Sequence, residues 1–159
     1  MKAAQIQTLE KKQFDTWENS LEGIHDNLKL LEVAPHIEVK IVGVLAQLPK
    51  NVREFVYKEC AFISIGDSNA GTTFCMEQRN LKNFKWLIVL CDGAVNNDIS
   101  IIAHEIAHAT LGHKKFDSHV RKQAKKVETD AARLTKKWGF IGLGSDEKHC
   151  CAHLIGSLK

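Results

Sequence analysis

The chain of 159 residues contains no run of about 18 apolar residues, the length that a transmembrane helix needs. Its first residues, MKAAQIQTLEKKQFDTW, also lack an apolar core of the length found in signal peptides. The five cysteines include no C-x-x-C pair, and Cys60, Cys75 and Cys91 each lie in an apolar, strand-like run. We therefore expect reduced cysteines, no membrane partner and a cytoplasmic location, although delivery by a dedicated secretion system is compatible with the same features.

No internal repeat or low-complexity linker divides the chain, which predicts a single domain over residues 1–159. Its apolar fraction of 44% and charged fraction of 26% are ordinary for a globular protein and exclude a mainly disordered one. The net charge is only +3, but basic residues concentrate in residues 114–126. Such a run is typical of a solvated helix face, and nucleic-acid binding is the alternative, for which no recognised motif is present.

The only two prolines, Pro35 and Pro49, divide the N-terminal half into three segments. Apolar residues recur every three or four positions between Phe14 and Leu31, which predicts an amphipathic helix there. Pro35 ends this segment. Residues 36–48 are ambiguous between strand and helix, and the alternation of apolar residues at their start favours a strand. A short helix is expected over residues 51–59.

Strands and helices alternate in the second half. Residues 60–66 are a candidate strand, residues 72–78 alternate as an edge strand would, and residues 85–91 are apolar on both faces, as in a central strand. A turn at 68–71 and a loop at 92–98 are expected between these elements. Three more helices are predicted, over about 98–112, over about 118–138 and, as a short one, in the C-terminal tail. Asp98 is the expected N-cap of the first of these, and Gly112 is expected to end it.

The predicted helix 98–112 carries the motif His104-Glu105-Ile106-Ala107-His108. Two histidines four residues apart lie about 40° apart on one helix face, so both imidazoles can reach one metal ion at about 2.0–2.1 Å. Glu105 lies on the adjacent flank, where a general base can reach a metal-activated water without being a ligand. The motif therefore predicts a zinc site with Glu105 as the base.

A catalytic zinc needs a third protein ligand. The extended pattern H-E-x-x-H-x-x-G-x-x-H fails, because it requires Gly and His where the chain has Leu111 and Lys114. His113 is expected to be exposed or to cap the helix. The predicted helix 118–138 offers two acids that flank its buried stripe equally, Glu128 and Asp130. Small residues beside Glu128 allow another helix to approach, whereas basic residues surround Asp130, so Glu128 is the predicted ligand and Asp130 the reserve.

These residues resemble a known family. HEIAHATLGH, followed about twenty residues later by ETDAARL, resembles the gluzincin zinc peptidases, and within them the minigluzincins and the ImmA/IrrE family. Their second motif, E-x-x-A-N/D, matches at Glu128 and Ala131 but departs at Ala132, where the family tends to place the partner of a ligand histidine. Asp130 or a backbone carbonyl is a candidate replacement.

The resemblance implies a zincin-like α+β fold, in which a small mixed sheet packs with the active-site helix (about 98–112) and the second ligand helix (about 118–138). It implies a metalloendopeptidase with one zinc per chain, held by His104, His108 and Glu128, and Glu105 as general base. Residues 72–78 would be the edge strand that holds an extended peptide. The substrate would be a protein or peptide, with a transcriptional regulator suggested by analogy with ImmA-like proteins. The candidate oxyanion donors are Tyr57, His113, His119, His149 and His153.

Two other functions remain open. One is a zinc-stabilised regulatory or binding module that cleaves nothing, although a purely structural site has no need of Glu105. The other is a peptidase that acts on DNA-bound proteins in the manner of SprT-like enzymes, guided by the basic residues 114–126. The tail cluster His149–His153 is expected to present surface histidines, because cysteines at adjacent positions point about 100° apart on a helix and suit a second metal site poorly.

Overall fold

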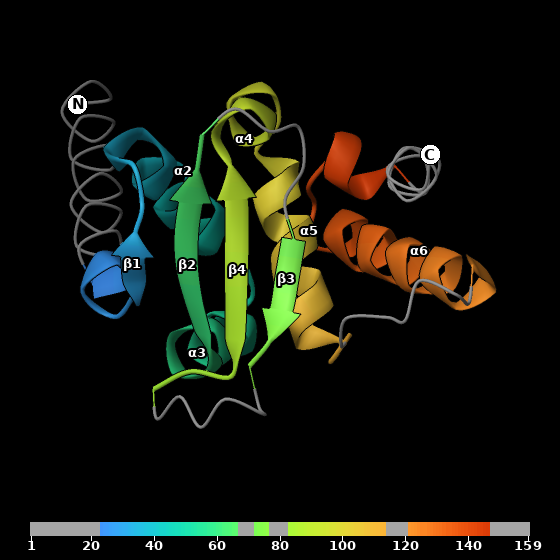
Figure 1. Ribbon diagram of the computed structural model, residues 1–159, viewed down its shortest axis with the longest axis horizontal. Helices are drawn as coiled ribbons and strands as arrows, with labels where there is room; N and C mark the ends of the chain where they lie inside the picture. The colour runs from blue at the N-terminus through green and yellow to red at the C-terminus, as the bar shows by residue number, and fades with distance from the viewer. Residues whose placement is uncertain (1–22, 67–71, 77–82, 114–120, 147–159) are drawn as a thin grey trace, which may run out of the picture.

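The computed structural model describes residues 23–66, 72–76, 83–113 and 121–146. These residues form a mixed α and β structure around a four-stranded sheet of order β1-β2-β4-β3 (Figure 1). The first three strands of that order run parallel, and β3 pairs antiparallel with β4. The predicted α+β class, with a small mixed sheet packed with helices, is therefore confirmed. The strands are β1 (Leu30–Glu32), β2 (Cys60–Ile65), β3 (Thr72–Cys75) and β4 (Trp86–Cys91).

The three predicted strands are confirmed, and so are the positions predicted for two of them. β4 lies in the interior of the sheet, between β2 and β3, and its Trp86, Ile88 and Leu90 are buried. β3 is an edge strand, as the alternation in residues 72–78 predicts. The central strand is apolar on both faces because one face packs against helices and the other is still half-buried.

The strand predicted over residues 36–48 is wrong, because this segment forms helix α2 (Pro35–Gln47). Ile37, Ile41 and Leu45 are fully buried at a spacing of four, whereas Val39, which the alternation would place beside them, is 72% exposed. Pro35 does not end a segment but begins this helix, where its fixed φ is favourable and its missing N–H has no helical partner. Alternation over three positions is therefore a weaker signal than the helical period of the whole segment.

Two further boundaries differ from the predictions. The expected loop 92–98 contains the short helix α4 (Asp92–Asn97), which buries Ala94 and Val95. The helix predicted from Phe14 to Leu31 is wrong at its end, because residues 30–32 pair with β2 as strand β1. The start of that helix, the turn 68–71 and the C-terminal tail lie outside the described residues. The short helix predicted at 51–59 is confirmed as α3 (Lys50–Glu59).

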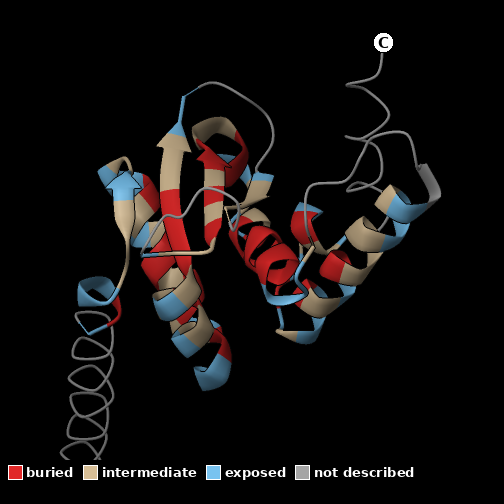
Figure 2. Cartoon of the chain, turned by 60° about the horizontal axis from the view of Figure 1, so that its bottom comes forward, coloured by how far each residue is buried: buried red, intermediate tan, exposed pale blue. Residues whose placement is uncertain are grey.

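Helices α5 (Ser100–Thr110) and α6 (Arg121–Lys137) confirm the two longer predicted helices. Figure 1 shows α2, α3 and α5 on one face of the sheet and α6 beyond α5, and Figure 2 shows α5 buried along most of its length. Asp98 is the predicted N-cap of α5, but Ile99 takes that position. The Asp98 carboxylate lies one residue earlier and accepts the Ser100 N–H at 2.8 Å. Gly112, with φ of +69°, ends the helix in the predicted left-handed turn.

The three described cysteines, Cys60, Cys75 and Cys91, are free thiols, as predicted. Burial raises the pKa of the Cys60 thiol to about 12, which suits a packing role rather than reactivity.

Lys125 and Lys126, from the basic run 114–126, are exposed on α6, and nucleic-acid binding stays a prediction. No helix within the described ranges is both long enough and apolar enough to cross a membrane.

A pair of substitutions tests the assignment of residues 36–48 to a helix. Ile41→Ala is expected to lower the free energy of unfolding by about 2–5 kcal/mol, because it leaves a cavity in the core. Val39→Ala, on the exposed side of α2, is expected to change it by no more than about 0.5 kcal/mol. Urea unfolding followed by circular dichroism measures both values, and similar large losses in the two variants would favour the strand instead.

Candidate metal centre

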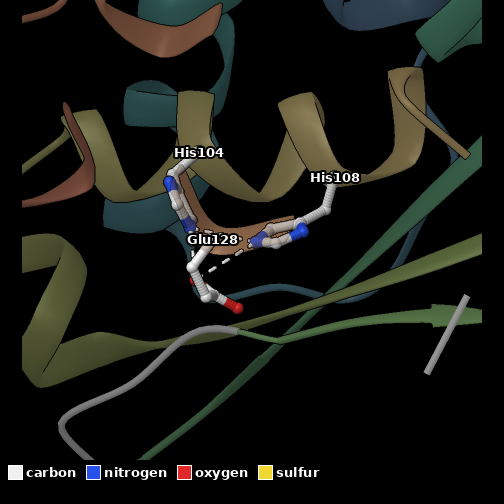
Figure 3. Close-up of side chains that lie close together, drawn as sticks. All are labelled: His104, His108 and Glu128. Carbon is white, nitrogen blue, oxygen red and sulfur yellow. Dashed lines mark hydrogen bonds and ion pairs between the residues drawn. The ribbon is translucent and has the colours of Figure 1, made fainter. Parts of the chain in front are cut away.

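Three side chains with electron-pair donors meet between α5 and α6. His104 and His108 point from α5 toward the carboxylate of Glu128 on α6 (Figure 3). The His104 Nε2 and His108 Nε2 atoms are 3.0 Å apart, and Glu128 Oε2 lies 3.1 Å from the first and 3.5 Å from the second. Among the described residues, this is the one group of three or more His, Cys, Asp or Glu side chains that could hold a metal ion.

The triangle formed by these three atoms has the size that a tetrahedral metal ion requires. A tetrahedral ion bound at about 2.0–2.1 Å separates its ligand atoms by roughly 3.3 Å, close to the three observed distances. His104 Nδ1 lies 2.7 Å from the carbonyl oxygen of Gly144, which can only accept a hydrogen bond. Nδ1 therefore carries the proton in the neutral ring, and Nε2 directs its lone pair toward Glu128. The donor set thus fits a metal ion.

The electrostatics of Glu128 support the same interpretation. Burial is the strongest influence on the pKa of its carboxyl group and raises it, but hydrogen bonds and charge interactions with His104 and His108 outweigh burial and lower the pKa to about 2. The carboxylate is therefore ionised at neutral pH. The hydrogen bonds that lower this pKa require protons on the two Nε2 atoms, whereas lone pairs at these atoms would face the carboxylate directly. In either case positive charge must lie between the carboxylate and the rings, from these protons or from a bound cation.

A turn that follows α6 in the chain fixes the orientation of His104. This turn, Leu143–Ser145, lies against the start of α5, where the Gly144 N–H donates to Ser100 Oγ at 2.9 Å and the Leu143 N–H donates to the Asp98 carboxylate. The Gly144 carbonyl then accepts the His104 Nδ1 proton. A backbone carbonyl thus partners His104, as one of the two alternatives predicted from sequence, and Ala132, where the second motif departs from the expected pattern, is fully buried.

His113 supports the second histidine. Its Nδ1 atom lies 3.0 Å from His108 Nδ1, on the side of the ring opposite Glu128. Burial, followed by the neighbouring His108, lowers the pKa of His113 to about 4, so His113 is neutral at pH 7 and can accept the His108 Nδ1 proton. His113 is predicted to be exposed or to cap the helix. Its backbone N–H does cap the end of α5 by donating to the His108 carbonyl, but its side chain is half-buried against His108 and is not exposed.

Glu105 follows His104 in the sequence and is buried on the same helix, but it is not one of the three grouped side chains. Its side chain is only 6% exposed, and its Oε2 atom accepts a hydrogen bond of 2.8 Å from Thr73 Oγ1 on β3. Sequence reasoning missed Thr73. The one sequence signal for Thr73 was its position in a predicted edge strand. That position places its side chain on one face of the sheet but does not identify Glu105 as its partner.

The remaining candidates do not join the cluster. Asp130, the reserve ligand, is half-buried on α6 and is not part of the three-residue group. Tyr57 is on α3 and packs against the hydrophobic core. His119, His149 and His153 lie outside the described residues.

Comparisons with protein-family models, with curated proteins and with solved structures gave no match for this chain.

Gly144→Ala is expected to weaken the binding of Zn²⁺, used as the probe ion, by about 10- to 100-fold. A Cβ atom at Gly144 would lie 2.2 Å from the Ser100 carbonyl oxygen, so the turn must move and His104 loses its acceptor. Competition with a chromophoric chelator measures the affinity.

The matched control is Gly43→Ala in α2, where a Cβ atom meets nothing within 4 Å. This variant is expected to bind Zn²⁺ like the wild type and to be more stable by up to about 1 kcal/mol, because alanine favours the helix. Wild-type affinity in Gly144→Ala would contradict the positioning role of the turn.

Proposed function

We propose that this protein is a zinc-dependent metallopeptidase with a zincin-like fold and a gluzincin-type ligand set. The observation that carries the proposal is the triangle of His104 Nε2, His108 Nε2 and Glu128 Oε2, with sides of 3.0–3.5 Å. Glu105 follows the first ligand on the same buried helix. The combination of two histidines, one carboxylate and a neighbouring acid that is not a ligand suits hydrolysis at a metal ion.

His104, His108 and Glu128 would hold the zinc ion. When bound, zinc supplies a Lewis acid that lowers the pKa of a water molecule and polarises a carbonyl group. Glu105 takes the proton of the attacking water and passes it to the nitrogen of the leaving amine, so that one carboxylate serves both steps. Its low exposure keeps bulk water away from the proton that it holds.

The edge strand β3 supports a peptide as the substrate. β4 occupies one edge of β3, and no strand in the described part of the chain pairs with its other edge. An extended peptide can add there as a further strand through main-chain hydrogen bonds, which gives affinity with little dependence on sequence. Thr73 connects this strand directly to Glu105, so the peptide would lie beside the proposed base.

The ligand count favours catalysis over a non-catalytic zinc module. Structural zinc sites are closed by four protein ligands, whereas catalytic sites use three and leave the fourth position for water or substrate. The described residues supply three ligands to this cluster. A structural module also has no use for a buried carboxylate next to its ligands, because burial of the Glu105 carboxylate costs free energy and the described structure gives it a neutral hydroxyl partner, not a cation.

Elemental analysis of protein purified without added metal tests the ligand set. We expect about one zinc ion per chain in the wild type and little or none in Glu128→Ala, because two histidines alone do not hold zinc tightly. Asp130→Ala is the matched control, since it removes a carboxylate from the same helix outside the cluster, and it should keep its zinc. A folded wild type that takes up no zinc on titration would contradict the proposal.

A second measurement separates catalysis from metal binding. Glu105→Gln is expected to keep one zinc ion per chain and to lose at least about 100-fold in the rate of peptide cleavage, because the amide cannot accept the proton. Mass spectrometry of a denatured-protein digest and of an extended-peptide library measures the cleavage. Equal cleavage by wild type and Glu105→Gln would point to a contaminating protease, and zinc-loaded wild type without cleavage would favour the non-catalytic module.

A further inference from the structure

The hydroxyl group of Thr73 makes two contacts with Glu105. Thr73 Oγ1 lies 2.8 Å from Glu105 Oε2 and 3.0 Å from the Glu105 main-chain oxygen. Both of these atoms are acceptors, so the single hydroxyl proton is shared between the carboxylate and the backbone of the same residue. The contact with the main-chain oxygen fixes the hydroxyl group next to Glu105. Rotation about the side-chain bonds of Glu105 would then break the contact with its carboxylate, so the hydroxyl restricts the rotamers of this side chain.

The sheet register explains why Thr73 reaches α5. Thr73 pairs with Ile88 on β4, and Ile88 pairs with Phe62 on β2, so these three residues form one row across the sheet. Phe62 and Ile88 are fully buried in the core. Thr73 continues their row at the edge, where a hydroxyl replaces an apolar side chain and meets Glu105. Its neighbour Thr72 faces the opposite side of the sheet and is exposed.

We propose that Thr73 is a positioning residue for Glu105, an inference that rests on the proposed peptidase function. Its hydroxyl holds the carboxylate between α5 and the edge strand, in one rotamer, before a substrate arrives. Because β3 is also the strand to which an extended peptide would pair, the same residue connects the substrate-binding edge with the proposed base. Thr73 makes no contact with His104, His108 or Glu128 among its hydrogen bonds, so its effect on metal binding is expected to be small.

Three variants of the full-length, zinc-loaded chain test this role. Thr73→Val keeps the shape of the side chain and removes the donor, and Thr73→Ser keeps the donor. Thr72→Val makes the same change at the neighbouring, exposed position of β3 and serves as the control for the stability measurement below, not for activity, because β3 is also the proposed peptide-binding strand. We expect Thr73→Val to lower kcat by about 10- to 100-fold, with KM and zinc content unchanged, because a misplaced base slows chemistry rather than binding. Thr73→Ser should stay within about threefold of the wild-type kcat.

A double-mutant cycle tests the contact without relying on activity. Glu105→Met removes the carboxylate acceptor and keeps the length of the side chain. Thr73→Val should therefore lower the urea midpoint more in the wild-type background than in the Glu105→Met background, where only the contact with the main-chain oxygen remains to be lost. Thr72→Val should shift the midpoint equally in both backgrounds.

The outcomes separate this inference from the proposed function. If the wild type cleaves peptide, a Thr73→Val variant with wild-type kcat, or a Thr73→Ser variant as slow as Thr73→Val, overturns the positioning role. Equal midpoint shifts of Thr73→Val in the two backgrounds overturn the contact itself. If the zinc-loaded wild type cleaves nothing, the peptidase proposal fails and the catalytic role of Thr73 fails with it, while the cycle still decides whether the hydroxyl holds the carboxylate.

Discussion

The close approach of three potential metal-binding atoms in a largely buried place is the constraint on which the rest of the site depends. His104, His108 and Glu128 direct two imidazole nitrogens and one carboxylate oxygen at each other across 3.0–3.5 Å, in a largely buried place. Such an arrangement is unfavourable unless positive charge lies between the donors. The ligands come from two helices, so an ion at this point would also join α5 to α6, and its binding free energy would add to the stability of their packing.

Helix α5 concentrates the buried polar side chains of the described structure. Ser100, His104, Glu105 and His108 are four of its five buried polar or charged residues, and the fifth is Thr135 on α6. Each of the four on α5 has a partner supplied by another segment: the turn 143–145 contacts the first two, β3 contacts Glu105, and His113 contacts His108. A helix placed this deeply in the core can carry polar groups only because every one of them is paired.

The centre of the site could be predicted from sequence because its information is local. The spacing of His104 and His108 follows from the pitch of one helix, and Glu128 could be separated from Asp130 by the size of its neighbours on another. Thr73 and Gly144 could not be found this way, because each meets α5 only after the chain has folded, and neither a threonine in a strand nor a glycine in a turn is distinctive. The error at residues 36–48 has another cause: the alternation around Val39 competed with a longer helical period, and tertiary packing followed the longer one.

The segment from α6 to Ser145 serves the site twice. Its helix supplies Glu128, and the turn that follows supplies the Gly144 carbonyl, which selects the proton position on His104. Ala132, at the point where the second motif departs from the expected E-x-x-A-N/D pattern, is buried in the helix packing and takes no part in this contact. No substitution can remove a main-chain carbonyl group. The contact with His104 therefore depends on the residue type at this position only through the close approach of the turn to α5. This position requires Gly144, because any side chain there meets the backbone of Ser100. The departure at Ala132 is therefore compatible with a fully supported ligand histidine.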